Sequence, residues 1–277
     1  MIATVLESGE LAALRASEAV IIEGENEEGR RVYLPHLAAS ERGLARKLNE
    51  LLLTSTLHAL ATPDDLATAE AHANIELHPD QQSAVLGLLA EPVGLLTGGP
   101  GVGKTTIIRL IVDLAKASGA KIALASPTGR AAKRLAEATG HKASTIHRLL
   151  GWDPHNRCFK HNHETPLEAD LLVVDEISML DVVLAHHLSQ AVSSPTRLVL
   201  VGDPDQLPSV GPGNVLSDLL SSGEVPVHRL TEIYRQAAGS LIIKNAHRVL
   251  AGELPVLPEK GDRSRDFYFF GAETPEE

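Results

Sequence analysis

A glycine-rich run between two apolar segments constrains the fold of this chain more than any other feature. Residues 98–105 read GGPGVGKT and match the pattern G-x-x-x-x-G-K-[ST]. The run follows a short apolar segment at residues 93–97 and opens residues 105–118, whose apolar side chains have helical spacing. Strand, loop and helix in this order let several backbone N–H groups surround one anion. The sequence therefore predicts an α/β domain with a phosphate-binding loop.

Three further apolar runs indicate other strands of the same domain. They lie at residues 121–126, 171–175 and 197–202, and helical patterns occur at residues 130–139 and 182–192. None of these runs alternates between polar and apolar residues, which is typical of strands covered on both faces of a parallel sheet. We therefore expect a mostly parallel sheet that is flanked by helices.

The phosphate-binding loop carries the groups that hold a nucleoside triphosphate. Lys104 can reach the β- and γ-phosphates, and the hydroxyl of Thr105 can ligate Mg²⁺. The expected cofactors are therefore ATP and Mg²⁺, and the alternative is a glycine-rich turn without a ligand. The residues assigned to nucleotide binding in this segment are Gly98, Gly99, Pro100, Gly101, Val102, Gly103, Lys104, Thr105 and Thr106.

Polar side chains follow the third and fourth predicted strands, at the edge where α/β sheets bind their ligands. Asp175 would hold Mg²⁺, partly through water, and Glu176 could take a proton from an attacking water. The alternative for this pair is the capping of the next helix. Gln206 could orient the water or contact the γ-phosphate.

Two weaker signals complete the predicted nucleotide site. The amide of Gln81 precedes the first predicted strand and could read the donor and acceptor edge of adenine. Arg235 could bring a second positive charge to the γ-phosphate. Each residue could equally be a solvated surface side chain.

The first 76 residues form a separate unit in this prediction. They contain a helical pattern at residues 6–14, two β-rich runs at 19–22 and 31–34 that suggest a hairpin, and a helical pattern over 41–60. This small N-terminal α+β appendage resembles part of a winged-helix unit. A packing appendage without a ligand is the alternative.

Charge is distributed unevenly along the chain. The 25 Lys and Arg against 36 Asp and Glu give a net charge of -11, which argues against a globally basic surface for nucleic acid. Residues 130–160, however, contain seven basic and two acidic side chains and form a local basic stripe. The alternative for this stripe is a solvated helix face.

Other features concern location and metals. No run reaches the roughly 18 apolar residues of a membrane helix, and the N-terminus lacks a signal peptide pattern, so we expect a cytoplasmic protein without a membrane partner. The single cysteine cannot form an intrachain disulfide. His155, Cys158, His161 and His163 lack the paired spacing of a zinc site, which favours surface side chains over metal ligands.

Taken together, the motifs resemble those of superfamily 1 DNA helicases of the RecD-like type, the exodeoxyribonuclease V alpha-subunit family. The resemblance implies a RecA-like P-loop NTPase domain at residues 77–255, with residues 256–277 forming a tail or the start of a following domain. It also implies ATP-driven 5′-to-3′ translocation on single-stranded DNA, duplex unwinding in recombination or repair, and helicase or nuclease partner subunits. The runs that carry the resemblance are residues 98–106, 126–135, 145–150, 174–179, 202–210 and 233–236.

The resemblance further implies roles for individual residues. Lys104, Glu176, Gln206 and Arg235 would be catalytic, with Arg235 as an arginine finger. Positions along the DNA groove are matched by Pro127, Thr128, Arg130, Thr145 and His147. From the residues alone, Trp152 and Phe159 are candidates for stacking on DNA bases, and the alternative for both is a place in the core.

The chain departs from the family pattern after Arg235. About 40 residues remain there, which cannot form a second motor domain of roughly 150 residues. We therefore expect the first motor domain only, with weak ATP binding and little unwinding in isolation. The alternatives are a nucleotide- and DNA-binding fragment without turnover, and an unrelated phosphoryl-transfer enzyme such as a small-molecule kinase.

Overall fold

The computed structural model describes residues 9–24, 31–54, 58–231, 240–257 and 266–268. Its centre is a parallel sheet of six strands: β3 (Val93–Gly98), β4 (Ile122–Ser126), β5 (Ala143–Thr145), β8 (Leu171–Val174), β9 (Arg197–Gly202) and β10 (Val227–Leu230). The strands lie in the order β10-β3-β9-β8-β4-β5, and every neighbouring pair is parallel. The predicted α/β architecture is therefore confirmed.

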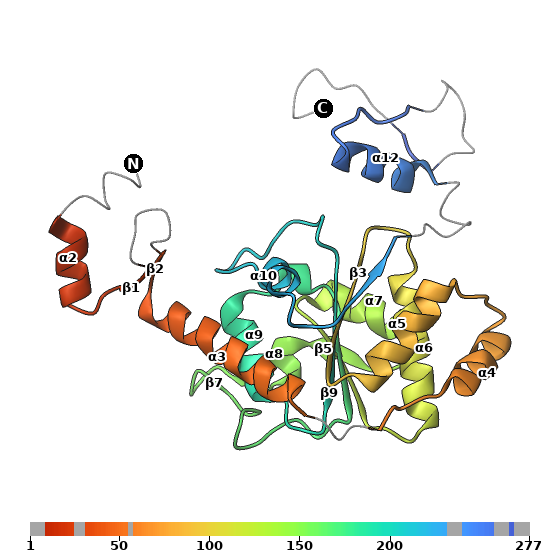
Figure 1. Cartoon of the computed structure of the whole chain (residues 1–277), viewed down its shortest axis with the longest axis horizontal. Coiled ribbons are helices and arrows are strands. Elements are labelled where there is room, and N and C mark those ends of the chain that lie inside the picture. Colours follow the sequence, from red (N-terminus) through yellow and green to blue (C-terminus); the bar gives the residue numbers. More distant parts are fainter. Residues whose placement is uncertain (1–8, 25–30, 55–57, 232–239, 258–265, 269–277) are drawn as a thin grey trace.

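A layer of helices covers each face of the sheet (Figure 1). The first layer consists of α3 (Pro35–Leu52), α9 (Val182–Gln190) and α10 (Val215–Ser222). The second consists of α5 (Pro79–Ala90), α6 (Lys104–Ala117) and α7 (Gly129–Thr139), with α4 (Pro63–Ala73) packed on α6. Successive strand residues alternate between the two cores, because side chains of a strand point to opposite faces in turn.

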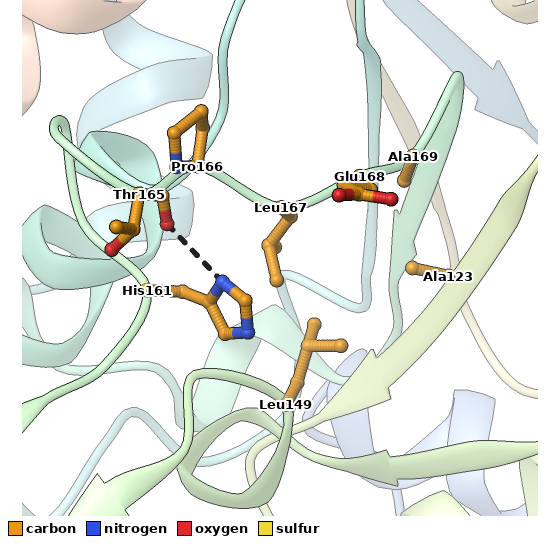
Figure 2. Close-up of a pocket in the computed structure, with 8 residues that line it drawn as sticks. All are labelled: Ala123, Leu149, His161, Thr165, Pro166, Leu167, Glu168 and Ala169. Carbon is orange, nitrogen blue, oxygen red and sulfur yellow. Dashed lines mark hydrogen bonds between the residues drawn. The ribbon is translucent and has the colours of Figure 1, made fainter.

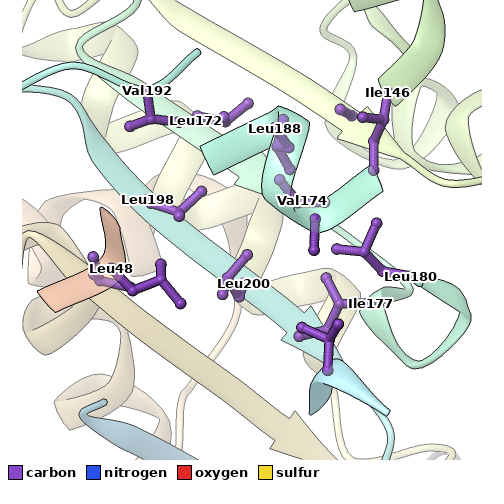
Figure 3. Close-up of a cluster of buried hydrophobic side chains, with 14 of the residues drawn as sticks. Leu48, Ile146, Leu172, Val174, Ile177, Leu180, Leu188, Val192, Leu198 and Leu200 are labelled. Carbon is purple, nitrogen blue, oxygen red and sulfur yellow. The ribbon is translucent and has the colours of Figure 1, made fainter. Parts of the chain in front are cut away.

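The first of these cores joins segments that are far apart in the sequence. Figure 3 shows Leu48 of α3 in one buried cluster with Leu188 of α9 and Leu200 of β9. Leu51 of α3 is 1% exposed and belongs to the same cluster. The helix α3 therefore shares its core with the sheet, although it belongs to the first 76 residues.

The N-terminal helices and strands are of the types that the sequence predicts, but their bounds differ from the predicted ones. After α2 (Gly9–Ala16), the strands β1 (Ile21–Glu23) and β2 (Arg31–Tyr33) pair antiparallel, so the predicted hairpin is confirmed. The prediction of one helix over residues 41–60 is wrong in its bounds. The helix begins at Pro35, which suits a first turn because proline has no N–H to leave unpaired, and Leu53 caps its end.

Several short elements connect the strands or follow the sheet. They are α8 (Ile146–Leu149), β6 (Trp152–Asp153), β7 (Cys158–Phe159), the 3₁₀ turn η1 (Ile177–Met179) and α12 (Leu241–Leu250). The strands β6 and β7 form an antiparallel hairpin. Within the described residues, no helix is both long and apolar enough to cross a membrane.

The contact between α3 and α9 gives a first prediction. A Cβ atom on Gly43 would lie 2.3 Å from Cε1 of His186, so Gly43→Ala must displace this ring. Gly129 of α7 is a matched control, because its Cβ position has no described atom within 4 Å. Both replacements favour a helix, and we expect Gly43→Ala to be less stable than Gly129→Ala by about 1–2 kcal/mol in urea denaturation. Equal stabilities would contradict the close packing.

Candidate nucleotide and DNA site

The phosphate-binding loop connects β3 to α6 in a conformation that requires glycine. Gly101 has a φ of 78° and Gly103 a φ of 91°, in the left-handed region that other residues rarely adopt. Gly103 is the N-cap of α6 and provides no side-chain hydrogen bond to the first turn. The backbone N–H groups of that turn are thus available to an anion, and the helix dipole favours negative charge there.

Lys104 folds back over this loop and faces a buried carboxylate. Its Nζ donates hydrogen bonds to the carbonyl oxygens of Gly98 and Gly99, the latter at 2.9 Å. The same Nζ lies 3.8 Å from Oδ2 of Asp203, which is 3% exposed. Asp203 follows β9, the neighbour of β3, and the sequence alone does not single it out. The order of the strands brings it to Lys104.

Asp175 and Glu176 come directly after β8, the strand on the other side of β9. The backbone N–H of Asp175 donates to the Ala125 carbonyl at 3.0 Å, and the N–H of Glu176 donates to Oδ1 of Asp175 at 2.9 Å. Glu176 has a φ of 58°, a left-handed conformation that is uncommon for glutamate and costs about 1 kcal/mol or more. The Asp175 carboxylate and the backbone of Glu176 are therefore held at the edge of the sheet.

The environment of Asp175 changes its acidity. Burial, together with the nearby charge of Glu176, raises the pKa of Asp175 from 3.8 to about 6. The carboxyl group therefore keeps its proton to a higher pH in the folded protein than in the unfolded chain. Between about pH 4 and 6 unfolding releases this proton, so the stability contributed by this group falls as the pH rises through that range. Above pH 6 the ionised carboxylate destabilises the fold.

We expect Asp175→Asn to stabilise the protein at pH 8, in the absence of metal and nucleotide, by about 2–3 kcal/mol. At pH 4 the folded wild type holds Asp175 mostly protonated and uncharged, like the asparagine of the variant, so the two proteins should differ little in their free energy of unfolding. Urea denaturation at the two pH values measures the difference. Asp205→Asn, at an exposed position near the same edge, is the control and should change little. A variant no more stable than wild type at pH 8 would contradict the burial argument.

The remaining predicted nucleotide contacts lie around the same loop. Gln206 is exposed in the turn after β9, where its N–H donates to the Asp203 carbonyl at 3.2 Å. Gln81 is buried, and its Nε2 donates to the Val102 carbonyl at 3.1 Å while its Oε1 accepts from the N–H of His78 at 3.0 Å. Gln81 thus touches the loop itself, and its contact with adenine stays a prediction.

Two of the three other members of the predicted set are in the described part of the chain. Thr105 and Thr106 occupy the first turn of α6, where Thr105 is exposed and Thr106 is partly buried. Arg235 lies outside the described residues. Its role as an arginine finger therefore stays a prediction.

The donor atoms at this edge are suited to Mg²⁺. The Asp175 carboxylate and the Thr105 hydroxyl offer hard oxygen ligands, which this cation prefers. The buried hydroxyl groups of Thr97 and Ser126, at the ends of β3 and β4, have no hydrogen-bond partner among the described residues. Thr97 adjoins the loop and Ser126 lies further along the same edge of the sheet, and such unpaired polar atoms are consistent with a polar ligand there.

The residues predicted to contact DNA continue the same edge of the sheet. Thr128 caps α7 by accepting from the N–H of Ala131, and Thr145 caps α8 by accepting from the N–H of Arg148. The strands that precede them, β4 and β5, are neighbours, and Ser126 pairs in register with Thr145. The two caps therefore lie beside each other. The residues of this predicted set that are exposed are Arg130 and His147, and those partly buried are Pro127, Thr128 and Thr145.

Aromatic rings gather next to His147. The ring centroids of Trp152 and Phe159, in the β6–β7 hairpin, are 4.9 Å apart, and the His147 ring lies 6.4 Å from Trp152 and 5.7 Å from Phe159. Trp152 is 41% exposed, so one part of its ring packs and another part remains accessible. Base stacking on this ring stays a prediction.

The histidines around Cys158 have other surroundings. His161 lines a pocket together with Leu149 and Leu167 (Figure 2), and its Nδ1 lies 3.1 Å from the Thr165 carbonyl oxygen. The pocket has a volume of about 620 Å³. His155, Cys158 and His163 are exposed. No group of three or more potential metal-ligating side chains occurs in the described part of the chain.

Several known proteins are similar to this chain in sequence. Residues 81–212 match a family model described as an AAA domain. The ATP-dependent RecD2 DNA helicase of Deinococcus radiodurans is 42% identical over 231 residues, which are 83% of this chain and 31% of that protein. The RecBCD enzyme subunit RecD of Mycolicibacterium smegmatis is 43% identical over 165 residues, which are 51% of this chain and 30% of that protein.

The chain spans about a third of the length of these curated relatives. Among solved structures, a crystal structure of the Pif1 helicase from Candida albicans aligns with 69% of this chain and 47% of its own, at 24% identity and a TM-score of 0.48.

Proposed function

The chain belongs by sequence to the RecD-like helicases of superfamily 1, and from that premise we propose that it is the motor of an ATP-dependent DNA helicase. The proposed activity is 5′-to-3′ translocation on single-stranded DNA, coupled to duplex unwinding in recombination or repair. Residues 77–255 are the proposed motor domain, and residues 256–277 a tail or the start of another domain. Residues 1–76 are its proposed N-terminal appendage, whose helices α3 and α4 pack in the helical layers of the sheet.

One observation carries this proposal. The phosphate-binding loop, Asp203 and the Asp175–Glu176 pair follow three adjacent strands. Along the same edge, the cap Thr128 comes after β4 and the cap Thr145 is the last residue of β5. A nucleotide site and a DNA track on one edge of one sheet can be coupled by small movements of that edge. This arrangement supports a motor better than it supports a small-molecule kinase, which needs an acceptor pocket beside the nucleotide.

The hydrolytic roles follow from the chemistry of these side chains. Lys104 would bind the β- and γ-phosphates, and Thr105 with Asp175 would hold Mg²⁺, which when bound neutralises phosphate charge. Glu176 would accept the proton of the attacking water. Gln206 would orient that water and couple the γ-phosphate to the bound DNA. Arg235 would stabilise the charge that develops on the γ-phosphate.

The proposed DNA ligand is a single strand. Pro127, Thr128, Arg130, Thr145 and His147 would contact it, and the basic stripe at residues 130–160 would attract its phosphates. Affinity that depends on such phosphate contacts falls steeply with salt. Because the net charge of the chain is -11, attraction of DNA would depend on this local stripe and not on the surface as a whole.

Steady-state ATP hydrolysis with and without single-stranded DNA tests the proposal. We expect an oligothymidylate to raise kcat at least several-fold, and the effect to fade as salt rises from about 50 to about 300 mM. Lys116→Ala, at the exposed end of α6, is a control that should be stimulated like wild type. Binding of nucleotide and DNA without DNA-stimulated turnover would instead favour the alternative of a binding module.

Partner subunits are a further part of the proposal. The relative from Mycolicibacterium smegmatis is named as a subunit of the RecBCD enzyme. The relative from Deinococcus radiodurans is named as a RecD2 DNA helicase, without mention of other subunits. We accordingly propose that helicase or nuclease subunits are candidate partners.

A further inference from the structure

The ring of His247 rests against the phosphate-binding loop. His247 belongs to α12, which lies apart from the two helical layers that cover the sheet (Figure 1). A Cβ atom on Gly99 would be 3.2 Å from Cε1 of this ring, so the ring occupies the space that a side chain at Gly99 would need. The carbonyl of the same Gly99 accepts the hydrogen bond from Lys104. The imidazole is therefore next to the residue that the phosphate-binding lysine touches.

One nitrogen of this ring has no partner among the described residues. Nε2 of His247 is shielded from solvent and makes no hydrogen bond to any described residue. Cε1, the atom nearest to the Gly99 position, is bonded directly to Nε2. A buried ring nitrogen without a partner is costly, and in the Nε2–H tautomer it offers one donor beside the loop.

A second histidine provides the contrast. His228 of β10 also packs on a glycine, since a Cβ on Gly87 would lie 2.3 Å from its Cε1. Its Nε2, however, lies 3.0 Å from Oε2 of Glu91 and is therefore paired. His228 thus has a partner on its ring nitrogen, as a structural histidine does, whereas Nε2 of His247 has none among the described residues and lies at the nucleotide loop.

The helix α12 is built without the ring of His247. Ser240 caps its first turn, and the side-chain amide of Asn245 exchanges two hydrogen bonds with the backbone of Val256, at 2.9 and 2.7 Å. Arg248 donates from Nε to the Leu254 carbonyl at 2.8 Å. None of these hydrogen bonds within residues 240–257 uses the His247 ring, which leaves the ring available for another contact.

We propose that His247 binds the terminal phosphate of a nucleoside triphosphate held on the loop. Its Nε2–H donates a hydrogen bond to an oxygen of that phosphate, and this contact fastens α12 to the loaded loop. A nucleoside diphosphate lacks the acceptor, so α12 distinguishes the two nucleotide states. The inference rests on the proposed function, because it requires a triphosphate at Lys104.

Binding of ATPγS and of ADP to the full chain, measured by calorimetry with Mg²⁺, tests this role. We expect His247→Ala to weaken ATPγS binding about tenfold, the effect of one hydrogen bond to a charged group, and to leave the affinity for ADP within about twofold. His247→Gln, whose amide N–H can donate, should recover most of the loss. Lys244→Ala removes an exposed cation from the same helix and should bind both nucleotides like wild type.

Hydrogen exchange of residues 241–250 gives a second readout that does not depend on turnover. ATPγS should slow exchange there in the wild type and not in His247→Ala, whereas ADP should have little effect in either protein. Wild-type affinity of His247→Ala for both nucleotides, or an equal loss for both, would overturn the inference. If the wild type itself bound no nucleotide, or bound it independently of Lys104, the proposed function would fail instead.

Discussion

Lys104→Ala is expected to bind ATP more weakly than the wild type by a factor on the order of 10² to 10³. The lysine is the only group of the phosphate-binding loop itself that can carry a full positive charge to the phosphates. Charge-assisted hydrogen bonds of this kind contribute about 1.5–3 kcal/mol each, and two phosphate groups share the ammonium. Fluorescence of a labelled ATP analogue, titrated with protein, measures the change.

Lys116→Ala is the matched control, because Lys116 lies on the same helix but is exposed at its far end. Its affinity for ATP should stay close to that of the wild type. Removal of Lys104 also leaves the buried Asp203 without its ion pair, so the fold of the variant is checked by circular dichroism and thermal melting. A folded Lys104→Ala protein with normal ATP affinity would contradict the assignment of the loop.

Glu176→Gln is expected to bind ATP as tightly as the wild type and to hydrolyse it more slowly by a factor of about 10² or more. The replacement keeps the size of the side chain, and it removes the group that can accept a proton. The neighbouring Asp175 keeps its position, because its backbone and carboxylate contacts are made by backbone atoms of Ala125 and of residue 176. Single-turnover hydrolysis with excess protein separates this effect from binding.

Glu168→Gln serves as the control for the loss of one carboxylate. Glu168 is exposed shortly before β8, at the opposite end of the sheet, with an ion pair to Lys121 at 3.8 Å. Its hydrolysis rate should match that of the wild type. Normal turnover by Glu176→Gln would show that another group takes the proton, and Asp203 is then the next carboxylate to replace.

The strands that can be predicted from the sequence are those with a distinctive local composition. The segments at β3, β4, β8 and β9 are short apolar runs, and such runs are buried in almost any α/β sheet. The edge strands β5 and β10 are missed, because Ala143–Thr145 has no apolar run and Val227–Leu230 contains two polar residues. Edge strands need less apolar surface, since one of their sides has no neighbouring strand.

The candidate site divides in the same way. The loop from Gly98 to Thr105 can be predicted, because adjacent residues encode the strand, the turn and the start of the helix. The pair Asp175–Glu176 can be predicted because it directly follows an apolar strand segment. The contacts of Asp203 and His247 with the loop cannot be predicted in this way. Asp203 directly follows a predicted strand, but nothing in the sequence indicates that its carboxylate reaches Lys104. His247 has no local signal, and it reaches the loop from an element that is distant in the chain.

The sequence by itself determined the strand–loop–helix unit, the α/β class and the chemistry of the phosphate site, since these depend on residues that are near one another in the chain. The tertiary structure decided which strands are neighbours, and with that the approach of Asp203 to Lys104 within 3.8 Å. It also decided that α3 joins the core of the sheet and that His247 lies on Gly99. Such contacts arise from the packing of whole helices and strands, which no local pattern of residues encodes.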